Sequence, residues 1–323
     1  MLGELPLFKY VVRRLLILIP ILLGVALISS LMFYIVPGDI VRVMLGQHVD
    51  PYTYANVRTA LGLDIPFGEN FLGFMRNICR GDLGFSYIQQ RSVNQVILEA
   101  LPVTIKLTVV SLLVTIIVGI PVGILAAVKD RRAIGQAVNY GAMIGFSMPS
   151  FLLALFLQLF FGVWLGWFPI AGSGRGLISY VLPGLAIGLP SAAFYARVAR
   201  ASMLEVLTQE YILFATARGL PFNRVIINHG LRNALIPVIT QIGMDFGMFM
   251  TGAVLTETIF NLPGMGRLIF SSINARDFPV LRGALLFSAL IVVIVNLLVD
   301  LSYIRLDPRI ASAIVREGSD ADR

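Results

Sequence analysis

Apolar residues gather in six long runs, and the segments between the runs carry most of the polar and charged positions. A helix needs about 20 apolar residues to cross a bilayer. The first run is longer than the core of a signal peptide and no A-x-A cleavage site follows it, so we interpret it as a retained helix. The pattern predicts six transmembrane helices, at residues 15–36, 103–128, 140–165, 180–200, 238–259 and 281–304.

The composition leads to the same class of protein. Hydrophobic residues make up 57% of the chain and charged residues only 13%, whereas soluble domains carry about 25% charged residues. We therefore predict an all-α polytopic membrane protein. The net charge of +7 does not indicate nucleic-acid binding, because the basic residues lie mostly at the ends of the apolar runs instead of on one solvated face.

The distribution of Lys and Arg predicts the orientation of the helices, because these residues are enriched in cytoplasmic segments. We expect both termini and the segment 197–237 to be cytoplasmic. The basic residues on which this orientation depends are Lys9, Arg13, Arg14, Lys129, Arg131, Arg132, Arg197, Arg200, Arg218, Arg224, Arg232, Arg305, Arg309, Arg316 and Arg323.

The segment between the first two runs is long and is expected outside the cell. Turn-forming residues such as Pro37–Gly38–Asp39 alternate there with apolar positions. This mixture predicts a small ordered cap over the outer mouth, and a loose loop is the alternative. The predicted parts are a cytoplasmic N-terminus with the first helix (1–36), the external segment (37–102), a transmembrane core with a cytoplasmic loop at 201–237 (103–304), and a cytoplasmic tail (305–323).

Glycines recur four residues apart within the runs, a spacing that lets helix backbones approach closely. It predicts helix contacts without identifying the partner helix. The pairs are Gly119/Gly123, Gly141/Gly145, Gly184/Gly188 and Gly243/Gly247.

The sequence lacks the motifs of catalysis and of metal binding. It contains no G-x-x-x-x-G-K-[ST] loop, no G-x-S-x-G and no H-E-x-x-H. The single cysteine, Cys79, with only His48 and His229, excludes an intramolecular disulfide framework and a zinc cage, and we expect Cys79 to be a half-buried apolar side chain. We predict no catalytic residue, no metal site and no cofactor bound by this chain. Energy for uphill transport must then come from a partner or from an ion gradient.

The segment 210–237 is polar in an otherwise apolar region. Residues 204–218 are predicted to be helical, Gly219 is suited to the position after a helix end, and Pro221 is suited to the first turn of the next helix. This predicts two helices that meet at a tight turn on the inner membrane surface. The small side chains of Ala215 and Ala217 would fit a groove on another protein. An amphipathic helix that anchors the bundle in the interface is the alternative.

This segment resembles the EAA-type coupling loop of ABC importer permeases, in the variant of the dipeptide, oligopeptide and nickel group. The resemblance covers nearly the whole chain and is closest to the first-permease kind of that group. The matching stretches are PGD (37–39), LGLDIP (61–66), GDLGFS (81–86), GFSMPSF (145–151), GWFPIAG (166–172), ATARGL (215–220), HGLRNALIPVIT (229–240), NLPGMGRL (261–268), RDFPV (276–280) and NLLVD (296–300).

The coupling loop departs from the general pattern at two places. The E-A-A positions hold Leu213, Phe214 and Ala215, and Arg232 stands where the general pattern has proline. Both departures are similar to the peptide/nickel variant. They leave open whether Glu210 and Arg232 contact an ATPase or only brace the helix pair.

The resemblance implies a six-helix type I permease fold and a pore formed with a second, homologous permease subunit in the plasma (inner) membrane of a prokaryote. Two cytoplasmic ABC ATPase subunits, which bind ATP and Mg²⁺, would hold the short cytoplasmic helix, and an external substrate-binding protein would deliver di- or oligopeptides. The implied coupling residues are Glu210, Ala215, Ala217, Arg218, Gly219, Leu220, His229, Arg232, Asn233 and Pro237.

Acidic residues within a membrane span are costly, so Asp245 needs a reason for its place in the fifth run. It follows Gln241 by one helical turn, with Met248 and Gly252 on the same face. Our hypothesis is that these four residues line the translocation path and favour a cationic or amino-terminal group. A structural hydrogen bond or ion pair to a neighbouring helix is the alternative. Outside the spans, Arg267, Arg276 and Asp277 are expected to face outward, where they could contact the delivering protein or lie in a solvated loop.

Other classes remain open at this point. Nickel, glutathione, an opine or a sugar oligomer could be the substrate, since these permeases look alike. A secondary transporter driven by an ion gradient would show inverted repeats and charged residues at broken helices, and we see no repeat. A structural or sensory membrane scaffold would not need the cytoplasmic turn.

Overall fold

The computed structural model describes residues 4–35, 39–46, 48–130 and 133–306, and these residues are mostly helical. They divide into two compact units. The first (unit 1) comprises the described residues up to Thr104 and from Pro263 onward, and the second (unit 2) comprises 105–262. The described residues confirm the all-α prediction apart from one short hairpin.

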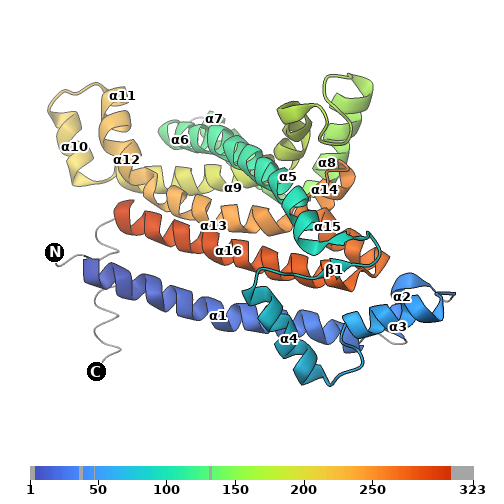
Figure 1. The fold of residues 1–323 in the computed structure, drawn as a ribbon. Coiled ribbons are helices and arrows are strands. Elements are labelled where there is room, and N and C mark those ends of the chain that lie inside the picture. Colours follow the sequence, from blue (N-terminus) through green and yellow to red (C-terminus); the bar gives the residue numbers. More distant parts are fainter. Residues whose placement is uncertain (1–3, 36–38, 47, 131–132, 307–323) are drawn as a thin grey trace. The chain divides into compact units, whose positions relative to one another are not determined.

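In unit 1, two long helices run side by side, α1 (Glu4–Ile35) and α16 (Phe278–Leu306) (Figure 1). The Asp39 and Asp50 carboxylates accept hydrogen bonds from Val41 N and Thr53 N and so begin the next two helices. The remaining elements are α2 (Ile40–Leu45), α3 (Pro51–Ala60), α4 (Phe67–Cys79), the antiparallel strands β1 (Phe85–Ser86) and β2 (Arg91–Ser92), the start of α5 (Val93–Val114), and α15 (Met265–Ala275).

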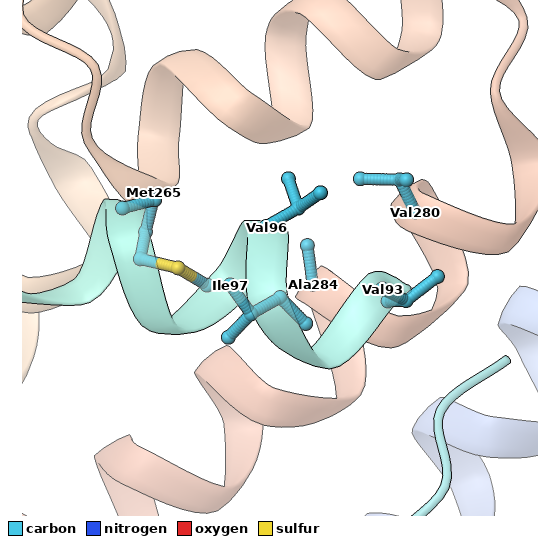
Figure 2. Close-up of a cluster of buried hydrophobic side chains, with 7 residues drawn as sticks. Val93, Val96, Ile97, Met265, Val280 and Ala284 are labelled. Atoms are coloured by element: carbon cyan, nitrogen blue, oxygen red, sulfur yellow. The ribbon is translucent and has the colours of Figure 1, made fainter. Parts of the chain in front are cut away.

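A buried apolar cluster joins the start of α5 to α15 and α16 (Figure 2). Its members include Val93, Ile97, Met265 and Val280, each at most 2% exposed. Gly283 of α16 lies against this cluster, where a Cβ atom would lie 2.5 Å from Val93 Cγ1. The two ends of unit 1 in the sequence therefore form one core.

The segment between the first two predicted spans is ordered and attached to the first turns of α16. Ser86 Oγ donates a 2.5 Å hydrogen bond to Asp277, whose side chain is fully buried, and the Arg282 guanidinium lies 3.5 Å from the Phe74 ring centroid. These contacts favour the ordered cap over the loose loop. They also correct the expectation for Asp277, which faces inward instead of lying in a solvated loop, while Arg276 is exposed. Pro37 and Gly38 lie outside the described residues.

Unit 2 is built around α9 (Val181–Leu207). The helix α5 continues through a π-helical turn at Thr115–Gly119 into α6, giving one helical run from Val93 to Val128. This run packs along α9, as do the neighbouring helices. The run ends with α6 (Ile120–Val128). The other helices against α9 are α7 (Ala133–Ser147), α8 (Ser150–Leu157), α10 (Glu210–Ala217), α12 (Leu231–Ala234), α13 (Ile236–Gly252) and α14 (Val254–Ile259), and α11 (Phe222–Val225) packs against α10.

Two of the predicted glycine pairs lie where helix backbones meet. A Cβ atom at Gly123 would lie 2.4 Å from the Ala196 carbonyl oxygen, and one at Gly188 would lie 2.6 Å from the Ser111 carbonyl oxygen. Nothing lies within 4 Å of a Cβ placed at Gly141. The spacing rule therefore holds for Gly119/Gly123 and Gly184/Gly188, and these pairs join the α5–α6 run to α9.

Three helices in the described part of the chain are long and apolar enough to cross a membrane: Val93–Val128, Gly176–Leu207 and Phe278–Leu298. They contain the predicted second and fourth spans and most of the sixth. The first predicted span lies within α1, with Leu16–Met32 as its apolar stretch, and the fifth corresponds to the apolar stretch Ile236–Met250. The helix α13 ends at Gly252 instead of continuing to residue 259.

The predicted span 140–165 is broken into two helices bent by 97°. The break falls at Pro149, which precedes α8 and has an extended backbone (ψ 129°). Proline has no N–H to donate and disfavours helical geometry in the residue before it. The run of apolar residues predicted one span over 140–165 and gave no sign of this bend.

Replacing Gly123 by Ala should destabilise unit 2, because the new methyl group meets the α9 backbone, with an expected cost of about 1–3 kcal/mol for overpacking. The matched control is Gly141→Ala, also within a helix but in open space, which should leave stability unchanged or slightly higher. Thermal unfolding of the purified chain in detergent measures both variants. Equal midpoints for the two would contradict the close approach.

Burial raises the pKa of the Asp277 carboxyl above its ordinary value. The folded protein therefore holds this proton more tightly than the unfolded chain does, so the carboxyl's contribution to stability falls as pH rises above about 4 and levels off above the raised pKa. Asp277→Asn keeps an oxygen that can accept from Ser86 and removes the titration. The variant's unfolding midpoint should rise relative to the unmodified protein as pH increases, and parallel pH profiles would refute this.

Candidate functional site

The segment after α9 forms a separate helix pair at one end of unit 2 (Figure 1). The helix α9 ends at Leu207, the Thr208 hydroxyl donates to the Glu205 carbonyl oxygen (2.7 Å), and Gln209 is extended. A hydroxyl that bonds its own backbone competes with continued helix. The prediction of one helix from Leu204 to Arg218 is therefore wrong, since α10 is a new helix from Glu210 to Ala217.

The tight turn of the pair lies where the sequence predicted it. Gly219 has a φ of +76°, a left-handed conformation that glycine adopts without strain, and it directly follows the Arg218 cap of α10. Pro221 precedes α11 as its N-cap instead of occupying its first turn. A π-helical turn, Ile226–Gly230, then leads into α12.

A small apolar core holds the pair together. Ile212, Ala215 and Val225 are buried against one another and against residues at the end of α9. Met203 of α9 lies beside Gly230. A Cβ atom placed on Gly230 would lie 2.9 Å from the Met203 methyl carbon. Ala215 therefore points into the pair and supports its shape, and Leu220 packs half-buried against the same core.

The exposed side of the helix pair carries large apolar side chains as well as polar ones. Leu213 is 60% exposed and Phe214 66% exposed, although both are large hydrophobic residues. We define the coupling surface as the exposed apolar residues of the pair, Tyr211, Leu213, Phe214, Phe222 and Ile227. The sequence prediction emphasised the small residues and missed these; the apolar residues at the first two E-A-A positions were the available signal.

Two of the polar residues predicted for coupling, Arg218 and Asn233, contact this surface. The Arg218 guanidinium lies 5.9 Å from the Phe214 ring centroid, and Asn233 Nδ2 donates a 2.8 Å hydrogen bond to the Tyr211 hydroxyl. The last contact ties the end of the segment to α10. The predicted residues with exposed positions are Glu210, Ala217, Arg218, Gly219, His229, Arg232, Asn233 and Pro237.

The chain leads from this pair directly into the proposed path helix, α13. Val238, in the first turn of α13, is fully buried against Tyr195 and Ala199 of α9. One turn later, Gln241 Nε2 donates a 3.1 Å hydrogen bond to Asp245 Oδ1, and both side chains are half-buried. The coupling and path residues thus share one continuous stretch of chain but do not form a single site.

The remaining path residues differ in their surroundings. Met248 is 68% exposed, whereas the surroundings of Gly252 lie outside what the structure describes. The Gln241–Asp245 hydrogen bond lies within one helix and fits both the path hypothesis and the structural alternative. Among the described residues, no cluster of His, Cys, Asp or Glu could hold a metal ion. Cys79 is exposed at the end of α4, which corrects the expectation of a half-buried side chain.

An ion pair joins the C-terminal part of α9 to the end of α6. Arg200 of α9 donates to the Asp130 carboxylate at the end of the α5–α6 run. The two helical runs also lie parallel, because Val110 meets Gly184 and, further along, Gly123 meets Ala196. Both runs therefore end at the same level, on the side where the coupling segment begins. Arg131 and Arg132 lie outside the described residues.

Comparison with known proteins gives a consistent picture. Two family models match: "Binding-protein-dependent transport system inner membrane component" over residues 119–312, and its N-terminal counterpart over 7–108. The glutathione transport system permease protein GsiC of Pectobacterium atrosepticum is 40% identical over 307 residues, covering 94% of this chain and 98% of that protein. The dipeptide transport system permease protein DppB of Alkalihalophilus pseudofirmus is 38% identical, covering 93% and 98%.

A solved structure supports the fold. An inward-facing structure of the MetNI methionine ABC transporter superposes with a TM-score of 0.56 at 18% identity, covering 66% of this chain and 97% of that chain. The relatives are permease proteins, which confirms the predictions of a transport subunit instead of an enzyme and of an inner-membrane location. The chain belongs to the family of inner-membrane components of binding-protein-dependent transport systems.

Proposed function

We propose that this chain is a pore-forming subunit of an ATP-driven importer for di- or oligopeptides, coupled to ATPases through the α10–α11 pair. The observation that carries the proposal is the coupling surface. Large apolar side chains such as Phe214 are exposed on a helix pair whose own core is buried, and exposed aromatic residues are frequent anchors of protein interfaces. An ATPase groove is the partner that the family assignment supports.

The same assignment supports the rest of the assembly. A binding protein belongs to the family's description, and it would deliver substrate on the side opposite the coupling surface. A second, homologous permease would complete the pore, and two ATPase subunits would bind ATP and Mg²⁺. The parallel ends of α6 and α9, with basic residues at both, support a cytoplasmic coupling segment, and the Lys and Arg residues of the terminal segments support cytoplasmic termini.

Peptides are the substrate class that the relatives favour. Those relatives are described as transporting glutathione and dipeptides, both small peptides with a free amino group. Asp245, on α13, offers a carboxylate that attracts such a cation, and Gln241 orients it through their hydrogen bond. We therefore propose that Gln241, Asp245, Met248 and Gly252 line the path. Nickel or another small solute is the alternative cargo.

Leu213→Arg should weaken the association with the ATPase subunits by at least about tenfold, because it places a charge where an apolar contact is buried. The matched control is Leu177→Arg, an exposed leucine just before the start of α9, the end remote from the coupling surface. Co-purification of the ATPases with each variant and ATP-driven peptide uptake measure the effect.

The control should retain ATPase association at the unmodified level. Phe214→Arg should behave like Leu213→Arg, whereas Ala215→Arg should also unfold the pair, because Ala215 belongs to its core. Full association and uptake in both the Leu213 and Phe214 variants would refute docking through this surface.

Asp245→Asn removes the charge of the proposed path residue and keeps an oxygen that can accept from Gln241. Uptake of peptides with a free amino terminus should fall by roughly tenfold, the equivalent of about 1.4 kcal/mol, whereas uptake of amino-acetylated peptides should not change. Competition assays with matched free and acetylated peptides measure the ratio. An unchanged ratio would assign Asp245 a structural role instead.

A further inference from the structure

Unit 1 contains an apolar cavity of about 420 Å³ between α1, α4, α5 and α16. Its walls include Leu22 of α1, Ile78 of α4, Leu98 of α5 and Leu290 of α16. Voids of this size are uncommon in protein interiors, which are packed as closely as organic crystals. The volume lies instead in the range of pockets that hold small molecules, about 300–1,000 Å³. None of the functions discussed above accounts for this cavity.

The side chains around the cavity offer an occupant no hydrogen bond. Among the described residues that line it, Asn94 alone has a polar side chain. Both ends of that amide are already bonded, because Oδ1 accepts from Leu83 N (3.0 Å) and Nδ2 donates to the Gly81 carbonyl oxygen. A buried water molecule needs two to four polar partners, so water is a poor occupant. The part of a ligand that lies in the cavity must therefore be apolar.

The cavity lies at the depth of the apolar spans and opens to the side. Its walls on α1 and α16 fall within the apolar stretches Leu16–Met32 and Phe278–Leu298. Ile19 and Leu23 of α1 and Leu98 of α5 line the cavity and are also exposed, so the opening lies between α1 and α5. The hydrocarbon of a bilayer would thus be next to the opening.

The size of the cavity favours a single hydrocarbon chain over a helix of another subunit. A helix with its side chains is about 10–12 Å across and rises 5.4 Å per turn, so one turn occupies roughly 420–610 Å³. The cavity has room for no more than about one turn, and its walls come from four helices of this chain. A partner helix therefore cannot be seated in it, whereas a flexible acyl chain can.

Two arginines lie beside one end of the cavity. Met75 and Ile78 of α4 line the cavity, and Arg76 and Arg80 lie at the same end of this helix, four residues apart and so on one side of it. Both are exposed, and within the described residues neither guanidinium pairs with a carboxylate. The nearby Asp82 lines a second, polar cavity instead. This end of the apolar cavity is therefore positively charged.

The pattern of α4 is that of a helix that lies in a membrane interface. Leu72, Met75 and Cys79 share one side of the helix, and Leu72 and Cys79 are exposed there. The long side chains of Arg76 and Arg80 emerge beside this apolar side. Arginine extends its apolar stem along such a surface and keeps its charged end at the polar boundary. The two guanidinium groups are thus suited to a lipid phosphate.

We propose that this cavity binds one acyl chain of a phospholipid, and that Arg76 and Arg80 bind the phosphate of the same molecule. Arginine forms charge-assisted, bidentate hydrogen bonds with phosphate. Arg91 and Glu99, near the opening on α5, pair with each other, so the charge of Arg76 and Arg80 favours an anionic phospholipid over a zwitterionic one. The acyl chain fills the space between α1 and α5 and joins the first helix to the rest of unit 1. This lipid site does not depend on the import activity.

Leu23→Trp fills the opening of the cavity with a large side chain. The matched control is Leu27→Trp, one turn further along α1, which is exposed but does not line the cavity. Native mass spectrometry of the full chain in detergent with added phosphatidylglycerol measures the fraction that retains one lipid. Leu23→Trp should weaken retention at least about tenfold, and the control should retain the lipid like the unmodified chain. Leu98→Trp, across the opening, should act like Leu23→Trp, so the test does not rest on the folding of one variant. Equal retention in the filled and control variants would show surface lipid only and overturn the proposal.

The phosphate contact has its own test. The double substitution Arg76→Gln, Arg80→Gln should remove the preference for phosphatidylglycerol over phosphatidylcholine, measured in the same way. Arg175→Gln, an exposed arginine that does not line the cavity, is the control with the same kind of charge change and should keep the preference. A preference that survives the double substitution would overturn the assignment of the phosphate to these arginines.

The assembled transporter distinguishes lipid from a covering subunit. It is reconstituted with phosphatidylglycerol that carries a photoactivatable group on one acyl chain, and labelled residues are mapped by mass spectrometry. Labelling should fall on the cavity walls, at Leu98 and Leu290, and should be lost in Leu23→Trp but not in Leu27→Trp. Labelling of the isolated chain that disappears on assembly would show that another subunit fills the opening, and the proposal would fail.

Discussion

The close approach of the α5–α6 run to α9 is the contact on which unit 2 depends. In a bilayer, apolar side chains gain little by leaving lipid, so helices associate through close packing and hydrogen bonds. Here glycines remove the side chains that would separate the backbones, and Thr115 Oγ1 lies 3.2 Å from the Gly188 carbonyl oxygen. The π-helical turn at Thr115–Gly119 lies in this contact, just before Pro121, whose missing N–H a regular helix would not tolerate well. The contact holds α9 in place, and the α10–α11 helix pair is built on the C-terminal end of α9.

At this end of α9, the helix pair is stiff because it has its own core. Ile212, Ala215 and Val225 fill the space between α10 and α11, and Met203 fixes the pair against α9 through Gly230. A force applied to Phe214 would therefore move the pair as a body instead of bending α10. Of the small residues that the sequence pointed to, Ala215 serves the core and Gly219 the turn, whereas Ala217 is exposed. The apolar side chains beside them would supply the proposed contact area.

The sequence predicted the features that depend on local chemistry and missed those that depend on residues distant in the chain. Apolar runs, the left-handed Gly219 and the two productive glycine pairs follow from length, backbone conformation and spacing, and the structure contains them. The bend at Pro149 was missed because a proline is tolerated inside α9, at Pro190, and not in the 140–165 span, and only packing decides between these outcomes. The burial of Asp277 depends on Ser86, which lies 191 residues away in the sequence, so no local sequence pattern predicts it. Likewise, the inward direction of Ala215 is set by Val225 across the turn.

The order of contacts along the chain constrains how a movement of the helix pair could reach the proposed path residues. Val238 is fully buried against Tyr195 and Ala199, so the first turn of α13 cannot slide along α9 without breaking that packing. Dense interiors resist gradual deformation, so a shift of the helix pair is more easily met by rotation about this contact. Gln241 and Asp245 lie one and two turns beyond it, and their hydrogen bond turns them together. Rotation at Val238 would thus change the direction of the Asp245 carboxylate and leave the α6–α9 contact intact. Movement of the coupling surface would in this way alter the exposure of Gln241 and Asp245, the polar pair described on α13.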